Sequence, residues 1–343
     1  MDRKYFLGST LALATGRFLP LKNLGSKWLN NDETAVYRQP AFLKPGDIIA
    51  ITSPAGSINI LEIQPAVRQL ESWGYKIKVG NTIGKKDFTF GGTDEERTAD
   101  FQDLLNDKEV KAIMCARGGY GSVRIVDQIN WDAFIKHPKW IIGFSDITVL
   151  HNHIHHNCKI ATIHSKMCNS FPEDLSKAEP LQIESINSIN KALAGNKMGY
   201  VALQTGQNKT GKGKGVLIGG NLKTIESLSG TASDIKTDNK ILFVEDTGEY
   251  LYSIDRMFWN LKRTGKLDHL NGLIIGGFSV KPDDPGEDFG KTLQQIVLEK
   301  VKEFNYPVCF DFPVGHQRSN FALKCGVKHS FIVNENEVTL NEL

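Results

Sequence analysis

Short apolar runs alternate with amphipathic segments from residue 42 to about residue 165, and this alternation restricts the fold more than any other feature. The apolar runs have the length of strands and lie at 48–52, 75–79, 110–116 and 140–143. The segments between them carry apolar residues at helical spacing and lie at 61–73, 93–106 and 123–129. Strands that alternate with helices pair in parallel through right-handed crossovers. The sequence therefore predicts an open α/β sheet in this part of the chain.

A sheet of this kind binds its ligands beyond the carboxyl ends of its strands. Three polar turns come directly after predicted strands: Ser53-Pro54-Ala55-Gly56, the glycine turn at 117–121 (RGGYG), and Ser145-Asp146. All three are expected at the same edge of the sheet. This edge is therefore the predicted location of a functional site.

The length of 343 residues exceeds what one compact core usually accommodates, so we expect two domains. Residues 1–41 are interpreted as a leader and extension, and residues 42–168 as the N-terminal α/β domain. Residues 169–210 are polar and weakly periodic, apart from a helical stretch at 181–194, and are interpreted as a linker. Residues 211–343 are predicted to form a second, β-rich α/β domain.

Charge and cysteine content exclude some classes of protein. The formal net charge is only +2, whereas nucleic-acid or anionic-membrane partners require a concentrated basic surface. The five cysteines are scattered and include no CxxC pair, so we expect neither a disulfide framework nor a zinc site. No nucleic-acid partner is expected.

The N-terminal residues MDRKYFLGSTLALATGRFLP carry a basic start at Arg3-Lys4 and then a short apolar run. This arrangement resembles a twin-arginine export signal with lysine in the second place. The run is too short to anchor the protein in a bilayer, and no other segment is long and apolar enough to span one. We therefore expect an exported or periplasmic protein without an integral membrane segment; the alternative is a cytoplasmic location.

Ser145 has two interpretations. It follows a strand-like run and precedes a helical one, so its hydroxyl is either an N-cap or a nucleophile. The turn lacks the glycine two places after the serine that marks a G-x-S-x-G motif, and local evidence alone favours the N-cap. A nucleophilic serine also needs a histidine base and an acceptor that orients this base.

Histidines are concentrated in two places. The string at 151–156 (HNHIHH) places His151 and His155 one helical turn apart, but no neighbouring carboxylate or cysteine completes a metal site. We interpret this string as a solvated helix face, with metal binding as the alternative. His316 instead lies in a loop after Gly315, where it is either a base or an exposed loop residue.

Glu245 ends a strand-like run at 241–244 and is followed by further acidic residues. A carboxylate at this position can orient an imidazole and stabilise its charged form. The alternative is an acidic cluster that complements the N-terminal dipole of the next helix. The residues alone leave both open.

Four motifs in this order resemble the LD-carboxypeptidases, the serine peptidases that include muramoyl-tetrapeptide carboxypeptidase and the microcin C self-immunity hydrolases. The motifs are RGGYG at 117–121, GFSDIT at 143–148, VED at 244–246 with YSIDR at 252–256, and Gly315-His316 with Asn320. The similarity extends from about residue 43 to residue 340. It implies a flavodoxin-like N-terminal domain and a β-rich C-terminal domain, with the active site between them.

The resemblance also implies roles for individual residues. Ser145 is the expected nucleophile, His316 the general base and acid, and Glu245 the carboxylate that orients His316. The backbone N–H groups of Asp146 and Gly119 are expected to form the oxyanion hole. Substrate contacts are expected from the rest of the glycine turn, namely Arg117, Gly118 and Tyr120.

The family implies hydrolysis of the L,D-amide bond that releases the C-terminal D-alanine from murein tetrapeptides, with no metal and no cofactor, and it makes a homodimer an expectation. One alternative is an immunity-type amidase that cleaves a peptidyl-nucleotide, for which Tyr120 or Trp259 would offer a stacking surface. The other is a non-catalytic α/β protein that holds an anion at the glycine turn.

Two departures from the family pattern affect the expected cleft wall. The family often has His-Gly-Pro where this chain has His164-Ser165-Lys166, and Gln317-Arg318-Ser319 follows His316 where glycine is usual. We interpret Lys166 as a surface lysine, because a single exposed charge is common. The alternative is that its positive charge meets a C-terminal carboxylate.

Overall fold

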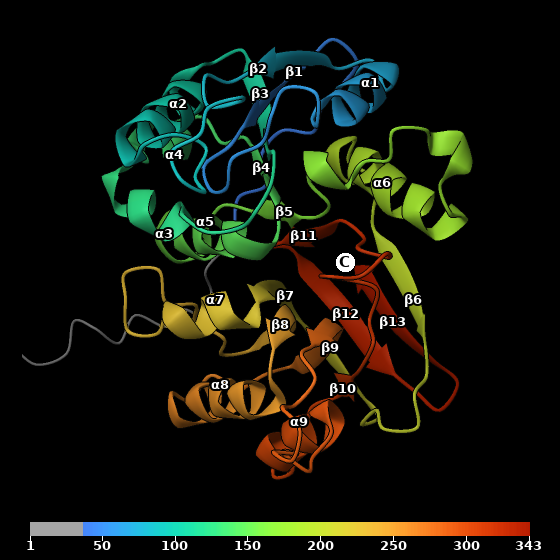
Figure 1. Ribbon diagram of the computed structural model, residues 1–343. Coiled ribbons are helices and arrows are strands. Elements are labelled where there is room, and N and C mark those ends of the chain that lie inside the picture. The colour runs from blue at the N-terminus through green and yellow to red at the C-terminus, as the bar shows by residue number, and fades with distance from the viewer. Residues whose placement is uncertain (1–36) are drawn as a thin grey trace, which may run out of the picture. The chain divides into compact units, whose positions relative to one another are not determined.

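The computed structural model describes residues 37–343, in which two β-sheets are flanked by helices (Figure 1). Most of the predicted leader, residues 1–36, lies outside the described residues. None of the helices within residues 37–343 is long and apolar enough to span a bilayer.

The first sheet has the strand order β11-β5-β4-β3-β1-β2. Its strands are β1 (Ile48–Thr52), β2 (Lys76–Val79), β3 (Val110–Cys115), β4 (Trp140–Gly143), β5 (Thr162–His164) and β11 (Leu323–Cys325). Strands β1 to β5 pair in parallel in the order 2-1-3-4-5, which is the flavodoxin order. Only β11, from the C-terminal part of the chain, is antiparallel to its neighbour β5. The predicted parallel α/β sheet is confirmed.

The helices around this sheet begin where the sequence provides start signals. They are α1 (Gln64–Ser72), α2 (Asp94–Asn106), α3 (Ser122–Ile125), α4 (Asp132–Lys136) and α5 (Thr148–His153). In α2, Thr93 accepts a hydrogen bond from the Glu96 N–H and the Glu96 side chain accepts one from the Thr93 N–H, which is a capping box. The helix predicted over 93–106 is therefore found with its predicted cap.

The second sheet has the order β10-β9-β8-β7-β12-β13-β6. Its strands are β6 (Gly199–Leu203), β7 (Gly211–Asn221), β8 (Lys240–Glu249), β9 (Gly272–Val280), β10 (Val308–Cys309), β12 (Lys328–Val333) and β13 (Glu337–Glu342). Strands β7 to β10 are parallel, whereas β12, β13 and β6 pair in antiparallel fashion. Its helices are α7 (Leu222–Ser227), α8 (Leu251–Arg263) and α9 (Leu293–Val301). This sheet is the predicted β-rich α/β domain.

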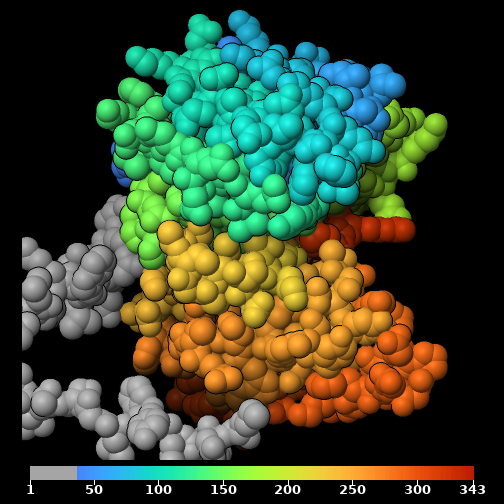
Figure 2. Space-filling view, turned by 60° about the vertical axis from the view of Figure 1, so that its left-hand side comes forward, coloured from blue at the N-terminus to red at the C-terminus, as the bar shows by residue number. Residues whose placement is uncertain are grey.

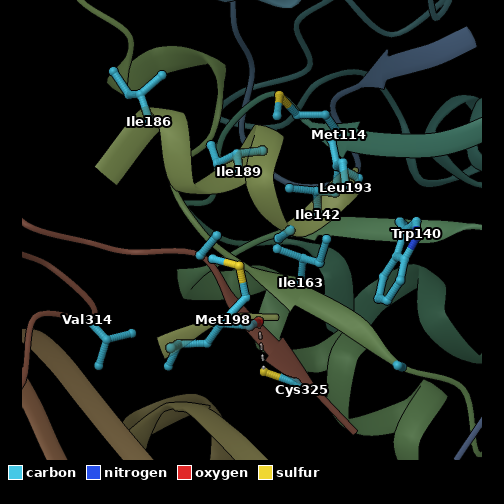
Figure 3. Packing of buried hydrophobic residues seen from close by; sticks show 14 of the residues in the cluster. Met114, Trp140, Ile142, Ile163, Ile186, Ile189, Leu193, Met198, Val314 and Cys325 are labelled. Carbon is cyan, nitrogen blue, oxygen red and sulfur yellow. Dashed lines mark hydrogen bonds between the residues drawn. The ribbon is translucent and has the colours of Figure 1, made fainter. Parts of the chain in front are cut away.

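The segment interpreted as a linker is largely structured. It contains α6 (Pro180–Leu193), within the predicted helical stretch, and β6, which pairs with β13. Ile186, Ile189 and Leu193 of α6 belong to the same buried cluster as Ile142 and Ile163 of the first sheet (Figure 3). The segment packs against both sheets because its helix has a buried apolar face that the weak overall periodicity concealed.

The chain crosses between the two sheets more than once. After β10 it returns to the first sheet as β11 and then re-enters the second as β12. In Figure 2 red C-terminal chain is visible between the blue-green N-terminal part and the yellow-orange part. The largest buried cluster contains residues of both sheets, among them Ile49, Ile163, Phe243 and Phe331. A shared core therefore fixes the carboxyl edges of β4 and β8 relative to each other.

Candidate active site

Ser145 lies in a strained turn between β4 and the short 3-10 helix Ser145–Ile147 that precedes α5. Its φ angle is +62°, a left-handed conformation that side chains other than glycine and asparagine seldom adopt. Strain of this kind is concentrated at functional sites, where the surroundings impose it. Phe144, not Ser145, holds the cap position, and no side chain caps this helix. The N-cap interpretation of Ser145 is therefore wrong.

The side chain of His151 forms a hydrogen bond with the backbone that leads into this turn. Its Nε2 lies 2.9 Å from the Gly143 carbonyl oxygen, and burial lowers the pKa of His151 to about 4. A neutral imidazole with its proton on Nε2 donates this hydrogen bond to the end of β4. The interaction joins α5 to the residue two places before Ser145, and so restricts the nucleophile turn.

The three polar turns meet at the carboxyl edge of the first sheet, as predicted. The Gly56 N–H donates to the Gly118 carbonyl at 2.9 Å, and the Ser122 N–H donates to Asp146 Oδ2 at 2.8 Å. Burial raises the pKa of Asp146, against hydrogen bonds that favour its charged form. A Cβ on Gly118 would lie 2.9 Å from Ser145 Cβ and 3.0 Å from Oγ. Only glycine therefore allows the backbone to approach the serine so closely.

The buried Arg97 of α2 supports the glycine turn from the other side. Its Nη1 donates to the carbonyl oxygens of Pro54 at 2.6 Å and Gly121 at 2.9 Å, and its Nη2 pairs with Asp94. One guanidinium thus connects the turn after β1 with the turn after β3. Sequence reasoning missed this residue, because an arginine inside a helix has no local feature that indicates burial.

Arg117 and Tyr120 have different surroundings from those expected of substrate contacts. Arg117 Nη1 donates to the Ser57 carbonyl at 3.0 Å and so holds the turn after β1. Tyr120 is 55% exposed, and its ring lies 5.9 Å from that of Phe90. Neither residue lines the pocket described below. Their role in substrate binding stays a prediction.

Glu245 and His316 form a close pair at the carboxyl end of β8. His316 Nδ1 lies 2.5 Å from Glu245 Oε2, and the His316 backbone N–H donates to the same oxygen at 3.2 Å. A Cβ on Gly315, whose φ is +98°, would lie 2.3 Å from Glu245 Cβ. The glycine before the histidine is therefore required for the carboxylate and the imidazole to come together.

The charge of Glu245 controls the pKa of His316. Burial disfavours the imidazolium, but the hydrogen bond and the negative charge of Glu245, together with the charge of Asp246, outweigh burial and raise the pKa of His316 above its usual 6.5. The buried carboxylate accepts a hydrogen bond from Nδ1–H, so that Nε2 of the neutral ring carries the lone pair. This is the form that a general base requires.

The His316–Glu245 pair lies beside the nucleophile turn. The ring centroids of Phe144 and His316 are 4.9 Å apart, and the Asn221 N–H at the end of β7 donates to Thr148 Oγ1 at 3.0 Å. Asn221 is the direct neighbour of Glu245 in the sheet. Among residues 37–343, Ser145 Oγ makes no hydrogen bond. Catalytic hydrogen bonds are often long in free enzymes and form fully with substrate.

An open pocket of about 810 Å³ begins at this pair. Its wall includes Phe144, Lys166, Gly315 and His316. Residues of the segment 169–182 and Thr247, Ser279, Gln317 and Arg318 complete it. Lys166 is only 7% exposed. The interpretation of Lys166 as a surface lysine is therefore wrong: it follows β5 at the same edge of the sheet as Ser145, and this strand of three residues is too short to be recognised from the sequence.

The histidine string is not a solvated face. His151, His153 and His155 are buried, with His155 Nε2 3.0 Å from Thr162 Oγ1 and His153 Nδ1 2.9 Å from Ser233 Oγ. Burial lowers the pKa of all three. Each is a neutral ring hydrogen-bonded inside the fold. Within residues 37–343 no group of three or more histidine, cysteine or acidic side chains is arranged to hold a metal ion.

Comparison with known proteins assigns the chain to a family. Residues 49–165 match the LD-carboxypeptidase N-terminal domain, and residues 214–331 match the LD-carboxypeptidase C-terminal domain. Fold and sequence together define an α/β peptidase. The chain belongs to the LD-carboxypeptidase family, as its motifs predicted.

Individual relatives agree with this assignment. The "Probable murein peptide carboxypeptidase" of Bacillus subtilis is 32% identical over 290 residues, which cover 84% of this chain and 90% of the relative. The microcin C7 self-immunity protein MccF of Escherichia coli is 26% identical over 301 residues, which cover 80% of this chain and 87% of the relative. The crystal structure of muramoyltetrapeptide carboxypeptidase from Oxalobacter formigenes matches with a TM-score of 0.77 and 25% identity, over 86% of this chain and 98% of the other.

Proposed function

We propose that this enzyme is a serine peptidase that hydrolyses the L,D-amide bond before the C-terminal D-alanine of murein tetrapeptides. The observation that carries the proposal is the pair formed by the buried Glu245 and the partly exposed His316, next to the strained Ser145 turn. A serine with left-handed backbone, an imidazole with a free Nε2 and a buried orienting carboxylate are the parts that acyl transfer requires. The names of two relatives, a murein peptide carboxypeptidase and a muramoyltetrapeptide carboxypeptidase, support the substrate class.

The first half of the reaction forms an acyl-enzyme. Ser145 Oγ attacks the carbonyl carbon of the scissile amide, and His316 Nε2 takes the hydroxyl proton. The negative charge on the carbonyl oxygen is stabilised by the backbone N–H groups of Asp146 and Gly119, which have fixed positions because the two turns are hydrogen-bonded to each other. His316 then gives its proton to the nitrogen of D-alanine, and the C–N bond breaks.

The second half repeats these steps with water. His316 takes a proton from water, the resulting hydroxide attacks the ester carbonyl, and Ser145 leaves as the alcohol after recovering the proton. Glu245 stays ionised throughout and stabilises the imidazolium that forms twice in each cycle. The net reaction consumes one water and needs no other reactant.

The proposal is tested with the tetrapeptide L-Ala-γ-D-Glu-meso-diaminopimelate-D-Ala. The wild-type enzyme should remove one alanine, seen by mass spectrometry, and D-amino-acid oxidase should identify the product as the D isomer. Ser145→Ala should release none, while circular dichroism shows that it is folded. A wild-type enzyme that leaves the tetrapeptide intact would overturn the proposed substrate.

The second candidate is an immunity-type amidase, which the likeness to MccF favours. Such an enzyme would need an aromatic surface for a nucleobase in its cleft. Tyr120 and Trp259, the aromatic residues expected for this purpose, do not line the pocket at His316, and Trp259 packs against Lys300 on α9, 5.1 Å from its ring centroid. Hydrolysis of an aspartyl sulfamoyl adenosine, but not of the tetrapeptide, would establish this candidate. The remaining alternative is a non-catalytic protein that binds an anion, and membership of a peptidase family does not support it.

Two further expectations stay proposals. We infer from the N-terminal residues that the protein is exported, and N-terminal sequencing of the protein from a periplasmic fraction tests this. A homodimer follows from the family resemblance alone, and light scattering of the purified protein tests it.

A further inference from the structure

Lys166 and Ser145 occupy equivalent positions on neighbouring parallel strands. Gly143 at the end of β4 pairs with His164 at the end of β5, and each strand is followed two residues later by one of these side chains. The Ser165 N–H donates to the Gly143 carbonyl at 3.2 Å, so the two strand ends stay together. Neighbouring strands are roughly 4.8 Å apart. The backbone of Lys166 therefore runs beside the nucleophile turn.

The position of Met167 shows independently that the segment after β5 lies close to Ser145. A Cβ placed on Gly118 would lie 3.0 Å from Ser145 Oγ and 3.4 Å from Met167 Cε. The side chain that follows Lys166 thus reaches the same point as the serine hydroxyl. Lys166 itself lines the pocket that begins at His316.

The side chain of Lys166 is largely buried, and it has no counter-charge within residues 37–343. The residue is 7% exposed, and no carboxylate or other acceptor among the described residues lies within ion-pair or hydrogen-bond distance of its Nζ. Lysines are almost never buried to this extent unless they are paired. Burial alone lowers the pKa of Lys166.

The other two cations on the pocket wall are already neutralised. Lys177 Nζ lies 3.3 Å from Asp174 Oδ2, and Arg318 pairs with Glu179. Both are exposed side chains, for which an ion pair contributes little. Among the lysine and arginine side chains of the described pocket wall, Lys166 is therefore the one without a carboxylate partner.

We propose that Lys166 binds the terminal carboxylate of the substrate and so selects a free C-terminus next to the scissile bond. The inference rests on the proposed peptidase activity. One residue separates the scissile carbonyl from the terminal carboxylate, a span of about 3.3–3.6 Å per residue in an extended peptide. This span is shorter than the roughly 4.8 Å between adjacent strands, and the flexible Lys166 side chain covers the difference, so that the carbonyl can lie at Ser145 while the carboxylate lies at Lys166.

A second carboxylate of the same substrate class has the same chemistry. The side chain of diaminopimelate in the third position ends in a carboxylate, whereas a lysine in that position has none. The experiment therefore varies the two groups separately. The three substrates are the diaminopimelate tetrapeptide, its C-terminal amide, and the tetrapeptide with lysine in the third position.

The test compares Lys166→Met with Lys177→Met, which removes a paired, exposed cation from the same pocket wall. We expect Lys166→Met to lower kcat/KM for both free-acid peptides by about 10- to 100-fold, mainly through KM, as expected for loss of a charge-assisted contact. Cleavage of the amide should be unchanged, so the preference for a free carboxylate disappears. Lys177→Met should keep this preference.

The outcomes separate this inference from the proposed function. Wild-type enzyme that releases no D-alanine overturns both. If the wild type is active and Lys166→Met keeps the full preference for the free acid, only the role of Lys166 is overturned. A loss confined to the diaminopimelate peptide assigns Lys166 to the side-chain carboxylate and overturns its assignment to the C-terminus. Unchanged cleavage of the amide shows in the same experiment that the variant is folded.

Discussion

Replacing Glu245 by glutamine tests how the buried carboxylate acts on His316. The wild-type carboxylate accepts two hydrogen bonds at one oxygen, from Nδ1–H at 2.5 Å and from the backbone N–H at 3.2 Å. Its other oxygen, Oε1, is buried and has no hydrogen-bond partner. Glutamine fits the same volume, and its amide has two orientations. Each orientation has a different consequence for the imidazole.

If the amide oxygen faces His316, both hydrogen bonds stay and only the negative charge is lost. If the NH₂ group faces His316, Nδ1 must accept and the proton moves to Nε2, where it blocks transfer from Ser145. The NH₂ orientation loses both hydrogen bonds, because neither Nδ1–H nor the backbone N–H can donate to an NH₂ group. Hydrogen bonds to a charged group contribute roughly 1.5–3 kcal/mol each, so this orientation costs roughly 3–6 kcal/mol. At 1.36 kcal/mol for each factor of ten, we expect kcat/KM to fall by about 10² to 10⁴.

The assay is D-alanine release from the tetrapeptide between pH 5 and pH 9. Glu249→Gln is the matched control, because Glu249 ends the same strand but accepts its hydrogen bond from Ser253 Oγ, at 2.6 Å. Without the charge at Glu245, the negative charge of Asp246 still raises the pKa of His316 but burial is opposed less strongly, so the acid limb of the variant should move to lower pH. Equal losses in the two variants, or an unmoved acid limb in Glu245→Gln, would refute the reasoning.

Three further predictions concern the surroundings of this pair. Wild-type kcat/KM should fall as the pH drops through the pKa of His316, with a midpoint above 6.5 because the neutral base is lost there; a rate unchanged down to pH 4 would exclude His316 as the base. Gly118→Ala should lower kcat/KM more than tenfold, because its Cβ would lie 2.9 Å from Ser145 Cβ, whereas Gly206→Ala, with no atom within 4 Å, should be neutral. The free energy of unfolding should fall in acid, because His151 has a folded pKa of about 4 and takes up its proton near 6.5 when unfolded; this group alone should remove about 2 kcal/mol between pH 7 and pH 5. Urea unfolding at the two pH values measures it, and equal stabilities would contradict the neutral buried ring.

The sequence predicted most of what is local. The alternation of apolar and amphipathic segments was sufficient for the parallel sheet, and the rule that ligands lie at strand ends placed Ser53, Arg117 and Ser145 at one edge. The motifs were sufficient for the family. Each of these features depends either on residues that are close in the sequence or on the relative direction of paired strands. The length of the connection between two strands determines this direction.

What could not be predicted depends on contacts between distant parts of the chain. The return of residues 323–325 to the first sheet requires a strand of three residues, too short to carry a periodic pattern. His155 is buried with a hydrogen bond to Thr162, and Lys166 shares its pocket with the C-terminal loop at 315–318. The residue type alone does not show whether a polar side chain is buried with a hydrogen-bond partner or exposed to water.

The roles of Ser145, His316 and Glu245 are tested most directly by labelling the native enzyme with a fluorophosphonate probe, which reacts with activated serines. Tryptic peptides are then mapped by mass spectrometry, and D-alanine release is measured on the same sample. We expect a single adduct on Ser145 and a loss of activity in proportion to labelling. Under the same conditions neither Glu245→Gln nor the denatured wild-type enzyme should carry an adduct. An enzyme that releases D-alanine while Ser145 stays unlabelled, or that carries its adduct on another serine, would contradict the assignment of Ser145 as the nucleophile.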